Sequence, residues 1–103
     1  MRESYSTLAG PVQWEIERIH GSRFLGLAAP VTSTNAIEAE LSRTRKSDHA
    51  AQHHCFAWRL GSGGERYRAN DDGEPSGSAG RPILERIDAL KLTDTLVVVT
   101  RYF

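Results

Sequence analysis

The sequence predicts one α+β domain with the element order β-β-α-β-β-α-β. Two pairs of short strand-like segments, each pair joined by a glycine-containing turn, predict antiparallel hairpins, and a helical period follows each pair. The chain has 103 residues, the usual size of a single domain. Its last apolar run, Leu96-Val97-Val98-Val99, is apolar on both strand parities, which predicts a central strand buried on both faces.

The first hairpin opens the domain. Apolar and polar residues alternate over 11–19, as in a strand with one solvated face. His20-Gly21-Ser22 supplies a turn, and a second strand over 23–29 ends at Pro30. Residues 1–10 are small and polar, and we expect them to form a flexible N-terminal arm.

A helix and a second hairpin come next. Asn35 followed three residues later by Glu38 is typical of a helix start, and the apolar stripe that follows predicts a helix over 35–46. A strand over 53–60 and a short strand over 65–69 flank a glycine-rich turn, which predicts a hairpin between them.

The second helix is predicted over 79–90. Pro82 falls in its first turn, where proline is tolerated, and Ser78 is a candidate cap. The final strand is predicted over 95–103 and would complete the sheet.

Charge and cysteine content exclude several classes of protein. The 13 basic and 13 acidic side chains give a net charge of 0, so no overall field attracts nucleic acid or an anionic membrane. No apolar run is long enough to span a membrane, and a single cysteine excludes an internal disulfide. We therefore expect a soluble, cytoplasmic protein that has no membrane partner.

The segment 71–81 is the principal functional candidate, and three chemistries compete for it. In the first, small residues at the mouth of the second helix leave backbone N–H groups exposed. Together with the side chains of Ser76, Ser78 and Arg81, those donors would bind a phosphate or a carboxylate.

The other two interpretations of this segment use its carboxylates. In the second, Asp71, Asp72 and Glu74 bind a hard cation such as Mg²⁺, although their spacing does not match a calcium-binding loop. In the third, no ligand is involved: aspartate and serine side chains cap the helix, and glycines adopt unusual dihedral angles in a long turn.

The run His53-His54-Cys55 is a weak candidate for a metal or catalytic site. Neighbours on a strand point to opposite faces, so only His53 and Cys55 converge, and two ligands do not make a zinc site. Cys55 precedes Phe56, Ala57 and Trp58, which is typical of a buried small side chain rather than a nucleophile. We expect neither a metal nor a cofactor.

The second hairpin also resembles a surface that stacks nucleic-acid bases. Phe56 and Trp58 supply aromatic rings, and the hairpin adds four further candidates: Arg59, Arg66, Tyr67 and Arg68. Ordinary cross-strand packing explains the same residues without any ligand.

Three blocks of the sequence resemble the IMPACT N-terminal domain family, which includes YigZ-like bacterial proteins. They are residues 51–58, 71–84 and 97–103, and Ser22-Arg23-Phe24 resembles the opening motif of the family. The block Asp71-Asp72-Gly73-Glu74-Pro75 is highly specific to it. The resemblance implies a two-layer domain over residues 11–103, similar to the second domain of a ribosomal small-subunit protein, with both helices on one face of a mostly antiparallel sheet.

For function, the resemblance implies less. Eukaryotic members are translational regulators that compete for an activator of a stress-responsive initiation-factor kinase, and bacterial members are suspected of nucleic-acid or ribosome contact. The sequence has Gly21, Ser78 and Arg81 where the family usually has Lys, Thr and Lys. Members continue past the Tyr-Phe pair with a glycine-rich segment and a helix, so the domain is expected to be incomplete at its C-terminus, with part of the last strand uncovered.

The leading hypothesis is a non-enzymatic binding module linked to translation regulation, with a protein or ribosome-associated partner. Its expected binding surface consists of Arg23, His53, Asp71, Asp72, Glu74, Ser76, Ser78, Arg81 and Arg101. One alternative is RNA or ribosome binding by the aromatic sheet face. The other is a metal-dependent hydrolase of a phosphorylated substrate that uses Asp71, Asp72, Glu74 and His53.

Overall fold

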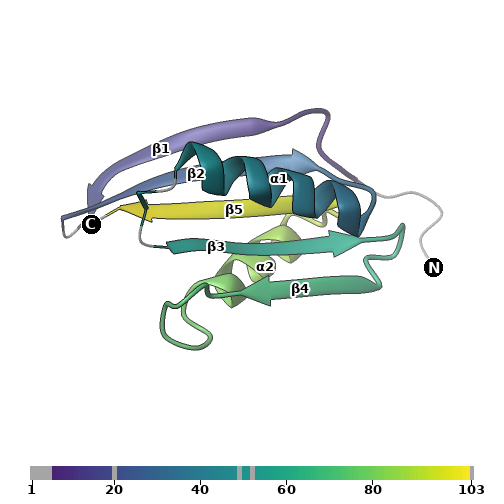
Figure 1. Cartoon of the computed structure of the whole chain (residues 1–103). Coiled ribbons are helices and arrows are strands. Elements are labelled where there is room, and N and C mark those ends of the chain that lie inside the picture. The colour runs from purple at the N-terminus through teal and green to yellow at the C-terminus, as the bar shows by residue number, and fades with distance from the viewer. Residues whose placement is uncertain (1–5, 20, 49, 52, 103) are drawn as a thin grey trace.

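The fold is an α+β domain with a five-stranded antiparallel sheet and two helices, as predicted (Figure 1). The computed structural model describes residues 6–19, 21–48, 50–51 and 53–102. In chain order the elements are β1 (Val12–Ile19), β2 (Ser22–Pro30), α1 (Thr34–Ser47), β3 (His53–Leu60), β4 (Arg66–Asn70), α2 (Gly80–Ala89) and β5 (Thr95–Tyr102).

Every element lies within one residue of its predicted bounds. His20 in the predicted turn and Phe103 in the predicted last strand lie outside the described residues, as do residues 1–5 of the predicted N-terminal arm. The arm's Ser6 and Thr7 contact the body of the domain: the Thr93 N–H donates to the Ser6 carbonyl at 3.0 Å, and the Thr7 hydroxyl donates to the Asp94 carbonyl at 3.1 Å.

The last strand lies in the middle of the sheet. The strand order is β1-β2-β5-β3-β4, so β5 joins the two hairpins and pairs antiparallel with both β2 and β3. This register places Phe24, Arg101 and His53 in one row across the three strands, because Arg101 is the partner of both. Residues far apart in the sequence therefore meet where β5 ends and where β2 and β3 begin.

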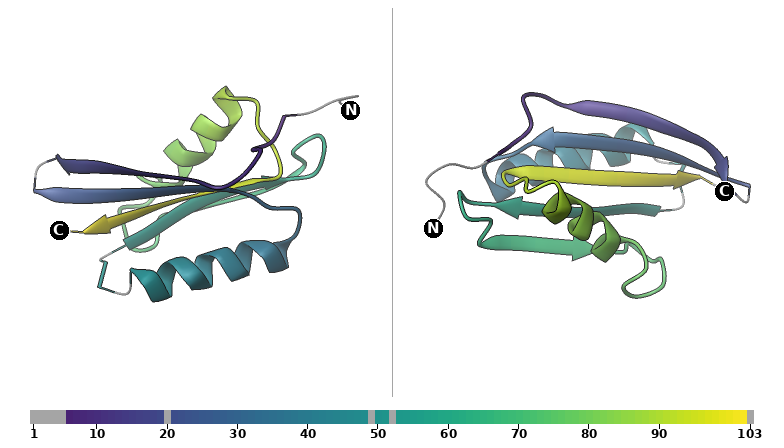
Figure 2. Two further views of the ribbon diagram at one scale, coloured as in Figure 1. Left: turned by 90° about the horizontal axis from the view of Figure 1, so that it is seen from above. Right: turned by 180° about the vertical axis from the view of Figure 1, so that it is seen from behind.

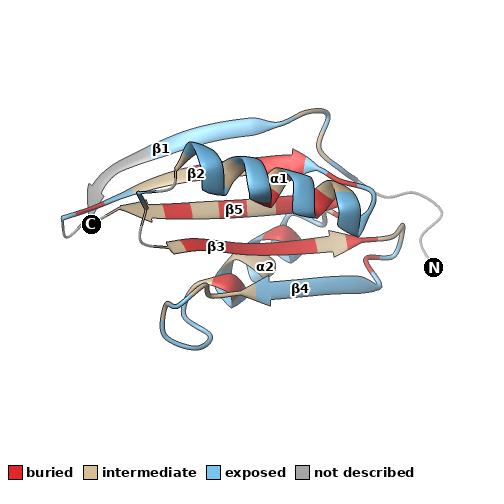
Figure 3. Ribbon diagram, in the orientation of Figure 1, coloured by how far each residue is buried: buried red, intermediate tan, exposed pale blue. Residues whose placement is uncertain are grey.

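One face of the sheet is covered by α1. Ile37 and Leu41 of this helix are buried in a cluster with strand residues of the same face, namely Leu27, Phe56, Trp58, Leu60, Leu96 and Val98 (Figure 3). The helix begins earlier than predicted, since the Ser33 hydroxyl, not Asn35, caps it by accepting from the Ala36 N–H at 3.1 Å.

The second helix lies on the opposite face, so the prediction that both helices share one face is wrong (Figure 2). The physical reason is that β3 and β5 carry apolar or small side chains on both parities, which requires cover on both sides. Cys55 and Ala57 alternate along β3 with Phe56 and Trp58 of the α1 cluster, so they face the side that α2 covers. Both are buried, and their small side chains let the helix approach β3 closely.

The cover that α2 provides is only partial. Val97 and Val99 of β5 are half-buried on this face, whereas Leu96 and Val98 on the other face are buried. Beside them, Val12 and Trp14 of β1 expose 51% and 39% of their surfaces. The prediction that β5 is buried on both faces therefore holds fully only on the α1 face. On the other face, an apolar cavity of about 510 Å³ lies between α2 and strands β1, β2 and β5.

Within the described part of the chain, neither helix has the length and apolar character that a membrane-spanning helix requires.

The contact between α1 and the sheet yields a stability prediction. Ile37 is 2% exposed, and truncating such a side chain leaves a cavity, so Ile37→Ala should lower the free energy of unfolding by about 2–5 kcal/mol. Urea unfolding followed by circular dichroism measures this. Glu38→Ala, in the same helix but exposed, should change it by less than about 0.5 kcal/mol. Equal losses in both variants would contradict the assigned helix face.

Candidate functional site

The loop between β4 and α2 is organised around the carboxylate of Asp71. Its Oδ1 accepts hydrogen bonds from the N–H groups of Ala79 at 3.1 Å and Gly80 at 2.8 Å, and its Oδ2 accepts from Gly77 at 2.8 Å. These three bonds lower the pKa of Asp71, because they stabilise its charged form. The start of α2 is therefore capped by a carboxylate nine residues away in sequence, and not by Ser78.

This geometry overturns the predicted anion site. The hypothesis required the amides before α2 to point outward, but those of Gly77, Ala79 and Gly80 all donate to Asp71. The Ser78 N–H donates to the Pro75 carbonyl at 3.0 Å, and the Ser78 hydroxyl donates to the same oxygen. These donors serve the loop itself, as the interpretation without a ligand anticipated.

Asp72 ties the loop to the start of β3. Its Oδ2 accepts from the His54 N–H at 2.7 Å, and its carbonyl oxygen lies 2.7 Å from His53 Nδ1. The next residue, Gly73, has a φ of +89°, and a Cβ there would lie 3.2 Å from His53 Nδ1. Glycine is needed at this position because the chain combines left-handed backbone with close approach to an imidazole ring.

Glu74 is held over the sheet by two basic side chains from two strands. Its Oε1 lies 2.6 Å from Arg101 Nη1 and 3.7 Å from His53 Nε2, and its side chain is only 12% exposed. Arg101 also donates through Nε to the Ser22 hydroxyl at 3.2 Å. The structure thus brings together three of the predicted site residues, His53, Glu74 and Arg101.

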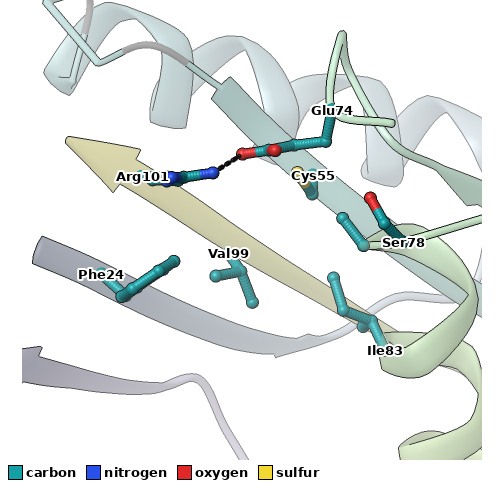
Figure 4. A pocket seen from close by; sticks show the side chains of 8 residues that line it. Phe24, Cys55, Glu74, Ser78, Ile83, Val99 and Arg101 are labelled. Atoms are coloured by element: carbon teal, nitrogen blue, oxygen red, sulfur yellow. Dashed lines mark hydrogen bonds and ion pairs between the residues drawn. The ribbon is translucent and has the colours of Figure 1, made fainter. Parts of the chain in front are cut away.

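A cavity of about 240 Å³ lies beside the Glu74–Arg101 ion pair (Figure 4). Its apolar wall includes Phe24, Val99 and Ile83, from β2, β5 and α2, and its remaining lining residues are Cys55, Glu74, Ser78, Ala79 and Arg101. Sequence reasoning missed the three apolar residues as site residues, because their patterns are those of ordinary core positions. The one available signal was Phe24, which stands in the Ser-Arg-Phe motif.

Three predicted site residues lie apart from this cluster. Arg23 is on the α1 face, where its guanidinium carbon is 4.6 Å from the centre of the Tyr102 ring. Ser76 is exposed. Arg81 is exposed on α2, with its Nε 3.8 Å from the Glu85 carboxylate.

The candidate metal ligands do not assemble. His53 and Cys55 share a face, as predicted, but no group of three His, Cys, Asp or Glu side chains suited to a metal ion occurs within the described ranges. Both carboxylate oxygens of Asp71 accept from backbone amides, and Asp72 accepts from the His54 N–H. The carboxylates of Asp71 and Asp72 are therefore engaged by the protein's own backbone, and that of Glu74 by Arg101.

Cys55 is a buried thiol, as predicted. It is 4% exposed, and its Sγ donates to the Asp71 carbonyl at 3.2 Å. Burial raises the pKa of this thiol to about 11, and the nearby carboxylates of Glu74, Asp72 and Asp71 add to the increase. At neutral pH it is protonated and a poor nucleophile.

The predicted base-stacking face is wrong, because Phe56 and Trp58 are buried beneath α1. Of the other residues in that proposal, Tyr67 is exposed on the opposite face, where the Arg59 guanidinium carbon lies 4.5 Å from its ring centre. Arg59 itself is held by two hydrogen bonds to the Asp88 carboxylate. Ordinary packing therefore accounts for the two rings that carried the hypothesis.

The thiol environment predicts slow alkylation. A pKa of about 11 instead of 9.0 lowers the thiolate population at about pH 8 roughly 100-fold, and the reaction rate should fall with it. Iodoacetamide labelling followed by mass spectrometry measures the rate, with the chain unfolded in urea as the control. Equal rates for folded and unfolded protein would contradict the assigned environment.

The Asp71 cap predicts a pH-dependent stability. Because its pKa is lowered in the folded state, the carboxylate stabilises the fold above its ordinary pKa, and this contribution is lost as the pH falls through the lowered value. Asp71→Asn should therefore reduce the melting temperature at neutral pH, and the difference from wild type should shrink below about pH 4. Thermal unfolding at a series of pH values tests this, with the exposed Glu38→Gln as control; a difference that is independent of pH would refute it.

Comparison with known proteins agrees with the fold and with the motif blocks. The Impact N-terminal domain family matches residues 20–103. The chain is 39% identical over 103 residues to IMPACT family member YvyE of Bacillus subtilis and 34% identical over 103 residues to IMPACT family member YigZ of Escherichia coli. These alignments cover 100% and 98% of the chain, and 47% and 50% of the two relatives.

A solved structure agrees with these matches. The crystal structure of a protein described only as hypothetical superimposes with a TM-score of 0.91 at 31% identity, covering 100% of this chain and 50% of the other. The chain thus spans about half the length of the proteins it resembles. With the domain match extending over residues 20–103, the chain belongs to the IMPACT family.

Proposed function

We propose that this chain is a non-enzymatic binding module that contacts a protein at the cavity beside Glu74 and Arg101. The observation that carries the proposal is that the loop uses two of its carboxylates to fix its own backbone and places the third at the cavity. Asp71 and Asp72 fix the backbone, and the structure they form holds Glu74 at the rim of an apolar cavity. A small apolar recess with a charged rim suits an anchoring side chain of a partner protein.

A protein partner fits the charge of this surface better than RNA does. The loop contributes three carboxylates, from Asp71, Asp72 and Glu74, and Arg101 is ion-paired to the last of these. A phosphate backbone would meet net repulsion there, whereas nucleic-acid affinity depends on unopposed positive charge. The buried positions of Phe56 and Trp58 remove the aromatic surface that the RNA alternative required.

A catalytic role receives less support from the same residues. The Cys55 thiol has a raised pKa, and the carboxylates of Asp71 and Asp72 are engaged by backbone amides. The hydrolase alternative assigned Asp71, Asp72, Glu74 and His53 to a metal and a phosphorylated substrate. Two of these four side chains, Asp71 and Asp72, instead hold the loop in place by accepting hydrogen bonds from backbone amides.

The link to translation rests on the family. The resemblance found in the sequence implies translational regulation for eukaryotic members, and it supports a protein or ribosome-associated partner in the cytoplasm for this chain. The chain spans about half the length of its bacterial relatives, and we propose that this half carries the contact with the partner.

Affinity capture with variants of the cavity tests the proposed function. Val99→Phe should fill the cavity, because Val99 lines it from β5, and Glu74→Gln should remove the rim charge. Both should reduce the recovery of specific partners from a cell lysate about tenfold, which corresponds to the loss of one anchoring contact.

The control is Glu38→Gln, which removes an exposed carboxylate from α1 on the other face. Thermal unfolding of each variant checks that the fold is retained. Sedimentation with purified ribosomes, before and after nuclease treatment, identifies ribosome-associated partners. Recovery that is unchanged in both cavity variants, or that disappears with nuclease alone, would overturn the proposal.

A further inference from the structure

We propose that the cavity receives a lysine side chain of the partner, with its alkyl stem inside and its ammonium group at the Oε2 atom of Glu74. This inference rests on the proposed function and names the chemistry of the partner. Figure 4 shows the arrangement on which it depends, with Phe24, Val99 and Ile83 around the cavity and the Glu74–Arg101 pair at its edge.

The size of the cavity limits the ligand to a single side chain. Its volume is about 240 Å³, below the range of about 300–1,000 Å³ that is usual for pockets that enclose whole small-molecule ligands. The apolar wall can take up methylene groups, and the polar groups gather on one side. Long basic side chains match this combination, since they bury their stems along apolar surface and keep the charged end at a polar rim.

The electrostatic field at the cavity wall favours a cation. Burial is the main cause of the raised pKa of the Cys55 thiol in the wall; Glu74, Asp72 and Asp71 raise this pKa further, and Arg101 opposes them with a smaller effect. The two aspartates accept hydrogen bonds from backbone amides, and no ion pair to either of them is found in the described ranges. Their charges therefore remain available to attract a positively charged group.

The state of the Glu74 carboxylate favours lysine over arginine. Oε1 accepts from Arg101 Nη1 at 2.6 Å and lies 3.7 Å from His53 Nε2, whereas no hydrogen bond to Oε2 is found among the described residues. An arginine fork binds best to both oxygens of a carboxylate, and one of them is already occupied. The compact ammonium group of lysine needs a single acceptor and keeps away from the Arg101 guanidinium.

Titration with three small probes tests the inference on the chain itself. The probes are the N-acetyl methylamides of lysine, norleucine and arginine, and the measurement is the change in backbone amide signals in ¹H–¹⁵N NMR spectra. The lysine probe should give saturable shifts at Cys55, Ala79 and Val99, which line the cavity. It should bind about fivefold more tightly than norleucine, which has no charge but a similar stem, and more tightly than arginine.

Variants separate this inference from the proposed function. Glu74→Gln should abolish the preference for lysine over norleucine, and Glu38→Gln should retain it. Equal binding of lysine and norleucine, tighter binding of arginine, or no saturable shift in the cavity with any probe would overturn the inference. If partner capture still depends on Val99 and Glu74 in that case, the binding module stands and only the lysine assignment fails; if capture is also independent of them, both fail.

Discussion

The carboxylate of Asp71 is the interaction on which the site depends. This carboxylate accepts from the Gly80 N–H at the start of α2 and from the N–H groups of Gly77 and Ala79 before it, which closes the loop on itself. The closed loop places Asp72 against the backbone of β3 and delivers Glu74 to Arg101 at the end of β5. Without this cap, neither the ion pair nor the cavity beside it would have a fixed geometry.

The loop shows how structural and functional roles divide among neighbouring carboxylates. Asp71 and Asp72 face backbone N–H groups, which fixes their positions and explains why aspartate, with its short side chain, stands at both places. Glu74 has the longer side chain and reaches across to a different strand. A structural role and a binding role for this segment are therefore compatible. Asp71 and Asp72 hold the loop together, and Glu74 lies at the cavity.

Local patterns predicted the elements, because alternation, turn residues and helical stripes are each set within a few residues of the chain. The side of the sheet on which each helix lies was not predictable in the same way. A helical stripe shows that Ile37 or Ile87 is buried but not against which face. The residues of β5, apolar on both parities, indicate cover on both faces of the sheet, whereas the family resemblance implies both helices on one face.

The site was predictable in part for a similar reason. The motif blocks identified His53, Glu74 and Arg101, but their meeting depends on the register of β5 between β2 and β3, which no local pattern specifies. Whether Asp71 faces solvent or the Gly80 amide depends on the path of the eight residues between them. That path is a property of the folded loop, so the anion hypothesis could fail while the same residues remained important.

The central position of β5 has a consequence for how the protein is made. Both hairpins precede this strand in the chain, yet they meet only through it. During synthesis on the ribosome, the two halves of the sheet must therefore wait, with their inner edges unpaired, until the residues of β5 have emerged. Long-range pairing of this kind makes folding slow relative to a helical protein of equal size. The sheet of the nascent chain can form cooperatively only after β5 is available to pair with β2 and β3.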